Sequence, residues 1–170
     1  MAWFRGTKMA VIWTVLRIWL GIQWLEAGIG KITGGFDATG YLQGAIAKAG
    51  GDHPAVQGWY AVFLKHAALP NAELINVLVP WGEALVGIAL IAGLATLPAL
   101  LAGAFMNLNF MLAGTTSTNP ILYTAAMLLM AVGAAAWFYG ADRFVIPHIK
   151  NYLKRNQGLK KTIQHHAAAH

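Results

Sequence analysis

The chain has 170 residues, of which 58% are hydrophobic and only 11% are charged, whereas a soluble domain has about 25% charged residues. This composition is typical of an integral membrane protein, and the absence of cysteine excludes disulfides, thiolate catalysis and iron–sulfur clusters. The net charge of +6 does not indicate nucleic-acid binding, because the basic residues gather at the two chain ends beside apolar segments, as membrane-flanking cations do.

The first apolar run covers about residues 9–29 and follows a basic N-terminal flank. Signal peptides also begin in this way, but this run is longer than a typical signal h-region and no small-x-small cleavage site follows it. We therefore predict a retained first membrane span, with Arg17, Gln23 and Glu26 inside it. The glycines of residues 28–35 predict that the helix ends there.

Residues 30–72 form the predicted outer loop, which is mixed in character. Asp37 is placed to cap one short amphipathic helix. A second helix is expected from about residue 56 to 68, with Pro70 to stop it. At about 10–14 residues each, these helices are too short to cross a bilayer and suit an interfacial position.

Three further apolar segments predict three more spans. They cover about residues 73–96, 97–114 and 121–140, and the tight turn between the first two makes them an antiparallel helix hairpin. The predicted fold is therefore an all-α integral membrane protein, a four-transmembrane-helix bundle over residues 1–147 with short amphipathic helices in the first outer loop. Residues 148–170 form a basic cytoplasmic tail.

The cations on both flanks of the bundle predict its orientation, because positively charged flanks stay in the cytoplasm. Both termini are expected there, as an even number of spans requires, and the loop of residues 30–72 is expected outside. The predicted location is the plasma membrane of a prokaryote, as a multi-pass protein.

Three polar residues fall near the predicted midplane of the bilayer. From a rise of about 1.5 Å per residue, Arg17 lies ~12 Å into its span, and Glu83 and Asn107 lie ~15 Å into theirs. A buried unpaired charge is costly, so we predict a charged Arg17–Glu83 pair with Asn107 within hydrogen-bond reach. Two interpretations stay open: a catalytic or binding site made by these three residues, and a polar group that only fixes the register of the helices.

A second set of side chains is predicted to bind substrate in a pocket that opens outward from this site. They are polar or aromatic residues of the first span, the outer loop and the third span: Gln23, Trp24, Glu26, Lys31, Trp59, His66, Asn109 and Phe110. The alternatives are an interfacial position for Glu26 and an inert exposed position for His66. No histidine lies in a predicted span, so a haem held by two histidines is excluded, and no metal site is expected.

The polar residues and the glycines around them resemble those of the DoxX family of small four-span membrane proteins. The resemblance rests on short matching segments: Leu16-Arg17, Gly28, Gly30-Lys31, Gly35-Phe36, Trp59, Pro80-Trp81-Gly82-Glu83, Leu85-Val86-Gly87, Leu90, Gly93-Leu94, the stretch from Met106 to Met111, Ser117 and Asn119-Pro120. It covers about residues 16–143. It is greatest to the branch that includes DoxD, a subunit of thiosulfate:quinone oxidoreductase.

This resemblance implies a subunit of a membrane oxidoreductase that passes electrons from a small sulfur-containing donor, such as thiosulfate, to quinone. The side chains expected to line the quinone slot are apolar or aromatic: Trp24, Phe110, Met111 and the Met127–Met130 pair. Arg17 and Asn107 would donate hydrogen bonds to the quinone, and Glu83 would supply protons. Arg17 and Lys31 are the cations available for a thiosulfate dianion. Electrons must then pass directly between the two substrates or through a partner redox subunit.

Two other functions stay open. The same outward pocket would serve a small transporter or a lipid-binding membrane protein, since transporters bind substrate near the membrane midplane. Alternatively, the chain is a structural anchor whose basic tail docks a soluble redox partner, although the cations of the tail equally suit anionic lipid. The expected partners are membrane lipid, quinone and a partner redox subunit. A second copy of the chain is retained as a candidate partner, and nucleic acid is not expected.

Overall fold

The structure is a computed structural model that describes residue 4 and residues 6–152. Within these residues every regular element is helical and no strand occurs, which confirms the all-α fold. The elements in chain order are α1 (Thr7–Gly34), α2 (Ala38–Ala47), α3 (Gly58–Phe63), the π-helical turn η2 (Leu64–Ala68), the 3₁₀ turn η3 (Leu69–Asn71), α4 (Ala72–Ala92), α5 (Thr96–Leu112), α6 (Asn119–Val132), the 3₁₀ turn η4 (Gly133–Ala136) and a helix over residues 142–152. Most of the predicted tail of residues 148–170 lies outside the described residues.

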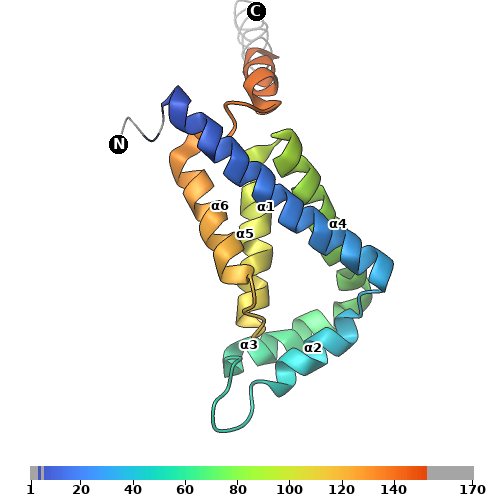
Figure 1. The fold of residues 1–170 in the computed structure, drawn as a ribbon. Helices are drawn as coiled ribbons and strands as arrows, with labels where there is room; N and C mark the ends of the chain where they lie inside the picture. Colours follow the sequence, from blue (N-terminus) through green and yellow to red (C-terminus); the bar gives the residue numbers. More distant parts are fainter. Residues whose placement is uncertain (1–3, 5, 153–170) are drawn as a thin grey trace, which may run out of the picture.

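The body of the molecule is made by α1, α4, α5 and α6. α1 packs mainly along α4, α5 packs against both α4 and α6, and α6 also contacts α1. Figure 1 shows α2 and α3 across one end of these helices, with the two ends of the described chain together at the other end. We refer to α2, α3 and η2 as the cap. Asp37 begins α2 by accepting hydrogen bonds from the backbone N–H groups of Thr39 and Gly40.

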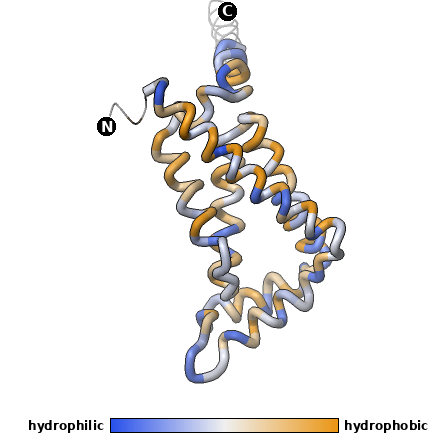
Figure 2. The backbone as a smooth tube through the Cα atoms, in the orientation of Figure 1, coloured by the Kyte–Doolittle hydropathy of each residue, from blue (hydrophilic) through white to orange (hydrophobic). Residues whose placement is uncertain are grey.

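The surface of the bundle is apolar, as expected of a membrane protein. Large side chains such as Val15, Leu85 and Phe105 are more than half exposed, and soluble proteins rarely expose so much apolar surface. Figure 2 shows hydrophobic residues along the long helices and hydrophilic residues in the loop between α2 and α3.

The length of the helices bears on the number of membrane spans. Three described segments are long and apolar enough to cross a membrane: Lys8–Gly34, Gly58–Ala92 and Asn119–Ala136. α5 is also apolar, but its 17 residues extend only ~25 Å. The chain thus has three to four apolar helices compatible with a membrane bundle, and the count of four spans stays a prediction.

α1 extends further than the sequence predicts. The glycines of residues 28–35 end the helix as predicted, but at the last of them and not at about residue 29: the helix continues to Gly34 and is capped by Gly35, whose φ of 72° is left-handed. The backbone N–H of Gly35 donates to the carbonyl oxygen of Lys31, a helix ending that glycine adopts without steric penalty. Lys31 therefore lies in the last turn of α1 and not in a loop.

The predicted stop at Pro70 is also wrong. The chain is helical without interruption from Gly58 to Ala92, through α3, η2 and η3 into α4. Proline cannot donate a backbone hydrogen bond, and here it falls in the tight turn η3 directly after the wide turn η2. These irregular turns accommodate the missing bond. Figure 1 shows the chain changing direction here, from the cap into α4.

Glycines allow the backbones of α1 and α4 to touch. A Cβ atom added to Gly28 would lie 2.5 Å from the backbone nitrogen of Ala84, and one added to Gly87 would lie 2.5 Å from the backbone nitrogen of Leu25. No side chain fits in such a gap, so these glycines fix where along α4 each residue of α1 lies. Small residues commonly serve this purpose between membrane helices, where close approach of the backbones provides van der Waals contact.

Gly28→Ala should therefore lower the free energy of unfolding by about 1–3 kcal/mol, the usual cost of extra volume in a packed interface. Gly30→Ala is the matched control. Its added Cβ meets no atom of the described chain within 4 Å, and alanine is the better helix former. Thermal unfolding in detergent, followed by circular dichroism, should show a lower midpoint for Gly28→Ala and an equal or higher one for Gly30→Ala. Equal midpoints for the two variants would contradict the close crossing.

Candidate functional site

Glu83 and Lys31 form an ion pair inside the bundle. The Lys31 ammonium donates to both carboxylate oxygens of Glu83, at 2.7 and 2.9 Å. The Glu83 side chain is 1% exposed and that of Lys31 is 28% exposed, so the carboxylate is the more deeply buried partner. An unpaired charge at membrane depth is costly, and pairing reduces that cost.

Arg17 does not take part in this pair, so the predicted Arg17–Glu83 pairing is wrong. Its guanidinium donates instead to the backbone carbonyl oxygens of Leu90, at 2.5 Å, and Tyr139, at 3.0 Å. α1 runs antiparallel to α4, so Arg17 meets the C-terminal end of α4, about two helical turns from Glu83. α1 has 28 residues against the 21 of α4 and extends beyond it, so equal depths within the two helices do not mean equal levels.

Arg17 belongs to a second buried cluster, the Arg17–Asp142 junction, made of Arg17, Ala95, Thr96 and Asp142. The Asp142 carboxylate is 4% exposed and accepts from the backbone N–H groups of Ala95 and Thr96, at 2.8 and 2.7 Å. It thereby caps the start of α5. Asp142 is also the anionic group that attracts the Arg17 guanidinium. The junction ties α1 to the α4–α5 turn and to the segment after α6, which is a structural task.

One face of α5 is turned toward α1 and carries Gly103, Asn107 and Phe110. The Lys31 ammonium lies 5.7 Å from the centroid of the Phe110 ring, a cation–π contact. The Trp24 indole covers Gly103, where an added Cβ would lie 3.1 Å from the indole nitrogen. Asn107 lies between these two contacts on the same face, and its side chain is 0% exposed. The interface of α1, α4 and α5 thus brings together several predicted site residues: Trp24, Lys31, Glu83, Asn107 and Phe110.

Contacts between α4 and α5 place Asn107 within one helical turn of the level of Glu83. An added Cβ at Gly82 would lie 3.5 Å from the sulfur of Met106, so these two residues face each other. Glu83 and Asn107 each follow by one residue in antiparallel helices, which offsets them by about 3 Å along the axes, and both side chains are buried. Neither the Asn107 amide nor the Trp24 indole nitrogen has a hydrogen-bond partner within the described part of the chain, so the predicted hydrogen bond between Asn107 and the charged pair is wrong.

A cavity of about 490 Å³ lies between the cap, α4 and α5. Its wall is largely apolar and rich in aromatic rings: Phe36, Tyr41, Tyr60, Phe63, Phe105 and Phe110. Few polar groups reach it. The Tyr60 hydroxyl donates to the side-chain oxygen of Asn109 at 2.9 Å, and the Tyr41 hydroxyl lies 3.1 Å from that of Thr115. An apolar cavity with a few polar groups is typical of a small-molecule site.

Tyr41 and Phe110 stand between the cavity and the ion pair. Their rings meet edge to face, with centroids 6.3 Å apart, and both rings line the cavity. Burial raises the pKa of the Tyr41 phenol; the hydrogen bond with Thr115 opposes this shift and the nearby Glu83 carboxylate adds to it. Tyr41 therefore keeps its proton at neutral pH and is available as a hydrogen-bond donor.

The remaining predicted residues do not converge on the ion pair. Glu26 and His66 are exposed, Trp59 is 61% exposed, and Gln23 is half-buried on α1. Asn109 lines the aromatic cavity but is held there by Tyr60.

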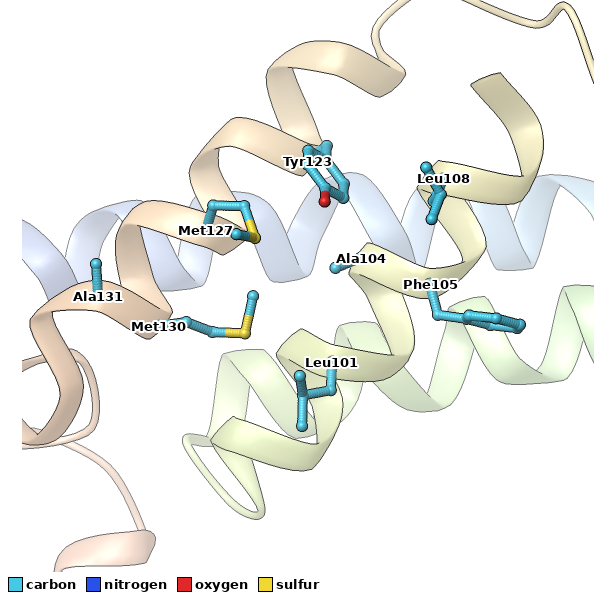
Figure 3. A pocket seen from close by; sticks show the side chains of 8 residues that line it. All are labelled: Leu101, Ala104, Phe105, Leu108, Tyr123, Met127, Met130 and Ala131. Atoms are coloured by element: carbon cyan, nitrogen blue, oxygen red, sulfur yellow. The ribbon is translucent and has the colours of Figure 1, made fainter. Parts of the chain in front are cut away.

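The predicted quinone slot is divided between different parts of the molecule. Met127 and Met130 lie in a shallow groove between α5 and α6, together with Phe105 and Leu108 (Figure 3). Trp24 packs in the core of the bundle, and Phe110 lines the cavity beneath the cap. These side chains therefore do not form one slot.

The described residues define an all-helical membrane protein with a buried ion pair beside an aromatic cavity. The model of the DoxX family matches residues 12–116, which include most of α1 and all of α2 to α5. The chain therefore belongs to the DoxX family, as predicted, and both the ion pair and the cavity lie within the matched part. Comparisons with curated proteins and with solved structures found no match.

Lys31→Met should destabilise the protein more than Glu83→Gln does. The first variant leaves an unpaired carboxylate that is 1% exposed, whereas the second leaves an ammonium that is 28% exposed and can turn toward the bundle surface. We expect Lys31→Met to cost on the order of 3 kcal/mol, and the double variant to recover part of this loss. Thermal unfolding midpoints provide the measurement, with the exposed Glu26→Gln on the same helix as the neutral control. A double variant no more stable than Lys31→Met would contradict the pairing.

Asp142→Ala should lower stability by about 1–2 kcal/mol, because it removes the cap of α5. Asp142→Asn should cost less, since asparagine retains a capping oxygen and loses only the charge that faces Arg17. Asp52→Ala, in the exposed loop between α2 and α3, is the control. Unfolding curves in detergent give the ranking, and equal effects of Asp142→Ala and Asp52→Ala would show that the cap carries no stability.

Proposed function

We propose that the chain is a subunit of a membrane oxidoreductase and that it binds quinone in the aromatic cavity between the cap, α4 and α5. One observation carries the proposal: an aromatic space of about 490 Å³ lies next to the buried Lys31–Glu83 pair. A quinone head group is a planar, uncharged ring with two carbonyl oxygens. It needs an apolar space with hydrogen-bond donors at its edge, and this cavity offers both. Membership of the DoxX family supports the membrane setting.

The side chains around the cavity suggest a division of roles. The hydroxyl of Tyr41 is the candidate donor to a quinone oxygen, because its phenol lines the cavity and Thr115 can serve as the donor in their contact. The Tyr60 hydroxyl, in contrast, already donates to Asn109. Reduction of a quinone takes up two electrons and two protons and leaves no net charge. Glu83, the buried carboxylate on the far side of Tyr41 and Phe110, is the candidate proton relay: it takes up a proton from the aqueous side and passes it on, twice for each quinone reduced. Lys31 balances its charge when the proton has left.

The proposed electron donor is a small sulfur-containing compound such as thiosulfate, in line with a DoxD-like role. The position of the cations favours delivery of its electrons by a partner redox subunit. Arg17 is engaged in the Arg17–Asp142 junction, and Lys31 is neutralised by Glu83, so neither is free to hold a dianion in the cavity. Oxidation of the donor on the partner would release the two electrons that the quinone takes up.

The proposed topology has four spans, with the cap on the outer side and both chain ends in the cytoplasm of a prokaryote. Figure 1 supports an even number of crossings, because the two ends of the described chain emerge at the same end of the bundle. The basic residues near both ends favour the cytoplasmic side.

A second candidate function is lipid binding or small-molecule transport through the same cavity. The largely apolar wall favours it, because an acyl chain requires no polar partner. Docking of a soluble partner through the basic tail rests mainly on residues outside the described part of the chain.

Gly82→Leu should abolish quinone binding. The new side chain would enter the cavity from α4, and leucine is a better helix former than glycine, so the fold should persist. Gly44→Leu on α2 is the matched control, since its added Cβ meets no described atom within 4 Å. Protein purified in native lipid should yield quinone on solvent extraction from the native chain and Gly44→Leu, and none from Gly82→Leu.

Glu83→Gln tests the redox step separately from binding. It should retain quinone and lose thiosulfate-dependent quinone reduction in native membranes, because glutamine cannot release a proton. Extraction of lipid in place of quinone from the native chain would favour the second candidate function, and unchanged turnover in Glu83→Gln would remove Glu83 from the mechanism.

A further inference from the structure

Three polar atoms between α1 and α5 are buried without a partner. They are the indole nitrogen of Trp24 and both the nitrogen and the oxygen of the Asn107 amide, none of which is hydrogen-bonded within the described residues. Trp24 is 2% exposed and Asn107 is 0% exposed. Each such atom gives up its hydration without replacement, and lipid cannot compensate at membrane depth. A leucine of similar size at position 107 would avoid the penalty, so the amide points to a bound polar ligand.

The arrangement of donors and acceptors selects the ligand. An indole nitrogen only donates, whereas an amide both donates and accepts. A ligand that satisfies them must accept from Trp24 and donate to the oxygen of Asn107, which neither a simple cation nor an anion does. Water does both, and buried waters in proteins typically make about three hydrogen bonds to otherwise unsatisfied groups.

The two side chains are close enough to share such a ligand. The Trp24 indole lies over Gly103, and Asn107 follows one helical turn later on the same face of α5, a rise of about 6 Å. Asn107 also lies within one helical turn of the level of Glu83, because their neighbours Met106 and Gly82 face each other and the next residues of the two antiparallel helices are offset by only about 3 Å. A water chain from Trp24 past Asn107 would therefore reach the inner side of the Glu83 carboxylate.

We propose that Trp24 and Asn107 hold buried water against Glu83, and that this water lets the carboxylate change its protonation state inside the membrane. Water donates a hydrogen bond to a carboxylate and accepts one from a carboxylic acid by rotating in place. Glu83 gives one proton toward the quinone and regains one from the aqueous phase on the exposed side of Lys31, and it does so twice for each quinone reduced, so no water is consumed. The role of the water rests on the proposed quinone reduction, whereas the water site itself does not.

The water site is tested by NMR of the full chain in lipid nanodiscs with ¹⁵N-labelled tryptophan. The indole proton of Trp24, assigned by its loss in Trp24→Phe, should show a dipolar cross-peak to water. Asn107→Leu should remove this cross-peak and leave the other indole signals unchanged, whereas Asn107→Ser, which keeps room and polarity, should retain it. Absence of the cross-peak from the native chain, or its persistence in Asn107→Leu, would overturn the site.

The role of the buried water in proton transfer by Glu83 is tested by measuring quinone reduction in native membranes. Asn107 does not line the cavity, so Asn107→Leu should retain quinone with an unchanged KM, while kcat falls about tenfold or more because proton transfer is hindered. Asn107→Ser should recover most of the rate. A native kcat in Asn107→Leu with the water cross-peak lost would overturn the role and leave quinone reduction standing. If the native chain binds no quinone, both the proposed function and the role of the water in it are overturned. The existence of the water site is then decided by the Trp24 cross-peak to water alone.

Discussion

The close crossing of α1 and α4 is the constraint on which the candidate site depends. Gly28 and Gly87 leave no room for a side chain between the two backbones, so the helices cannot slide past each other without a clash. This contact sets the register that puts Lys31 beside Glu83 and Arg17 beside Leu90. In a membrane, where apolar surface gains little by leaving lipid, such backbone contact is a main source of helix association. The Lys31–Glu83 ion pair thus depends on the positions of the glycines at the crossing of α1 and α4.

The two cations of α1 are used in ways that match their chemistry. Arg17 reaches the Leu90 carbonyl in the last turn of α4, where the helix dipole is negative, and its several donors serve this carbonyl and that of Tyr139 at once. Lys31 is a compact charge and meets one carboxylate. A lysine at position 17 would have too few fixed donors for both carbonyls. The arginine therefore holds the bundle together, and the lysine is left for the site.

Local signals in the sequence were sufficient for much of this architecture. Polar residues within apolar runs identified Glu83 and Asn107 as candidates, Lys31 was named as a cation of the predicted outer loop, and hydropathy identified the long helices. The pairing was predicted wrongly because equal depths in the first two spans were taken as equal levels, whereas α1 continues through its last turn to Gly34 and extends beyond α4. Without that last turn Lys31 belongs to a loop, and Arg17 becomes the nearest available cation.

Tyr41 could not have been identified from the sequence by any periodic pattern. Its importance comes from Phe110 and Thr115, which are far away along the chain and are brought near only when the cap folds over the end of the bundle. Similarly, the continuous helix through Pro70 depends on two consecutive irregular turns, and their formation is decided by the packing of the cap. Contacts between residues that are far apart in the sequence cannot be predicted from local helix propensity.

The rings of Tyr41 and Phe110 allow a charge to act on the cavity without entering it. The electron-rich face of an aromatic ring attracts a cation, so the Lys31 ammonium is stabilised near Phe110 while the cavity wall remains apolar. In the proposed function, negative charge arrives in the cavity with the electrons. When Glu83 carries its proton, the Lys31 charge behind the wall is no longer neutralised and would stabilise that negative charge, because electrostatic interactions extend further in a medium of low dielectric. The Glu83–Lys31 ion pair is the state after the proton has left, so Glu83 must take up a proton before the next transfer. The tyrosine hydroxyl in the wall has the position from which that proton can be passed on.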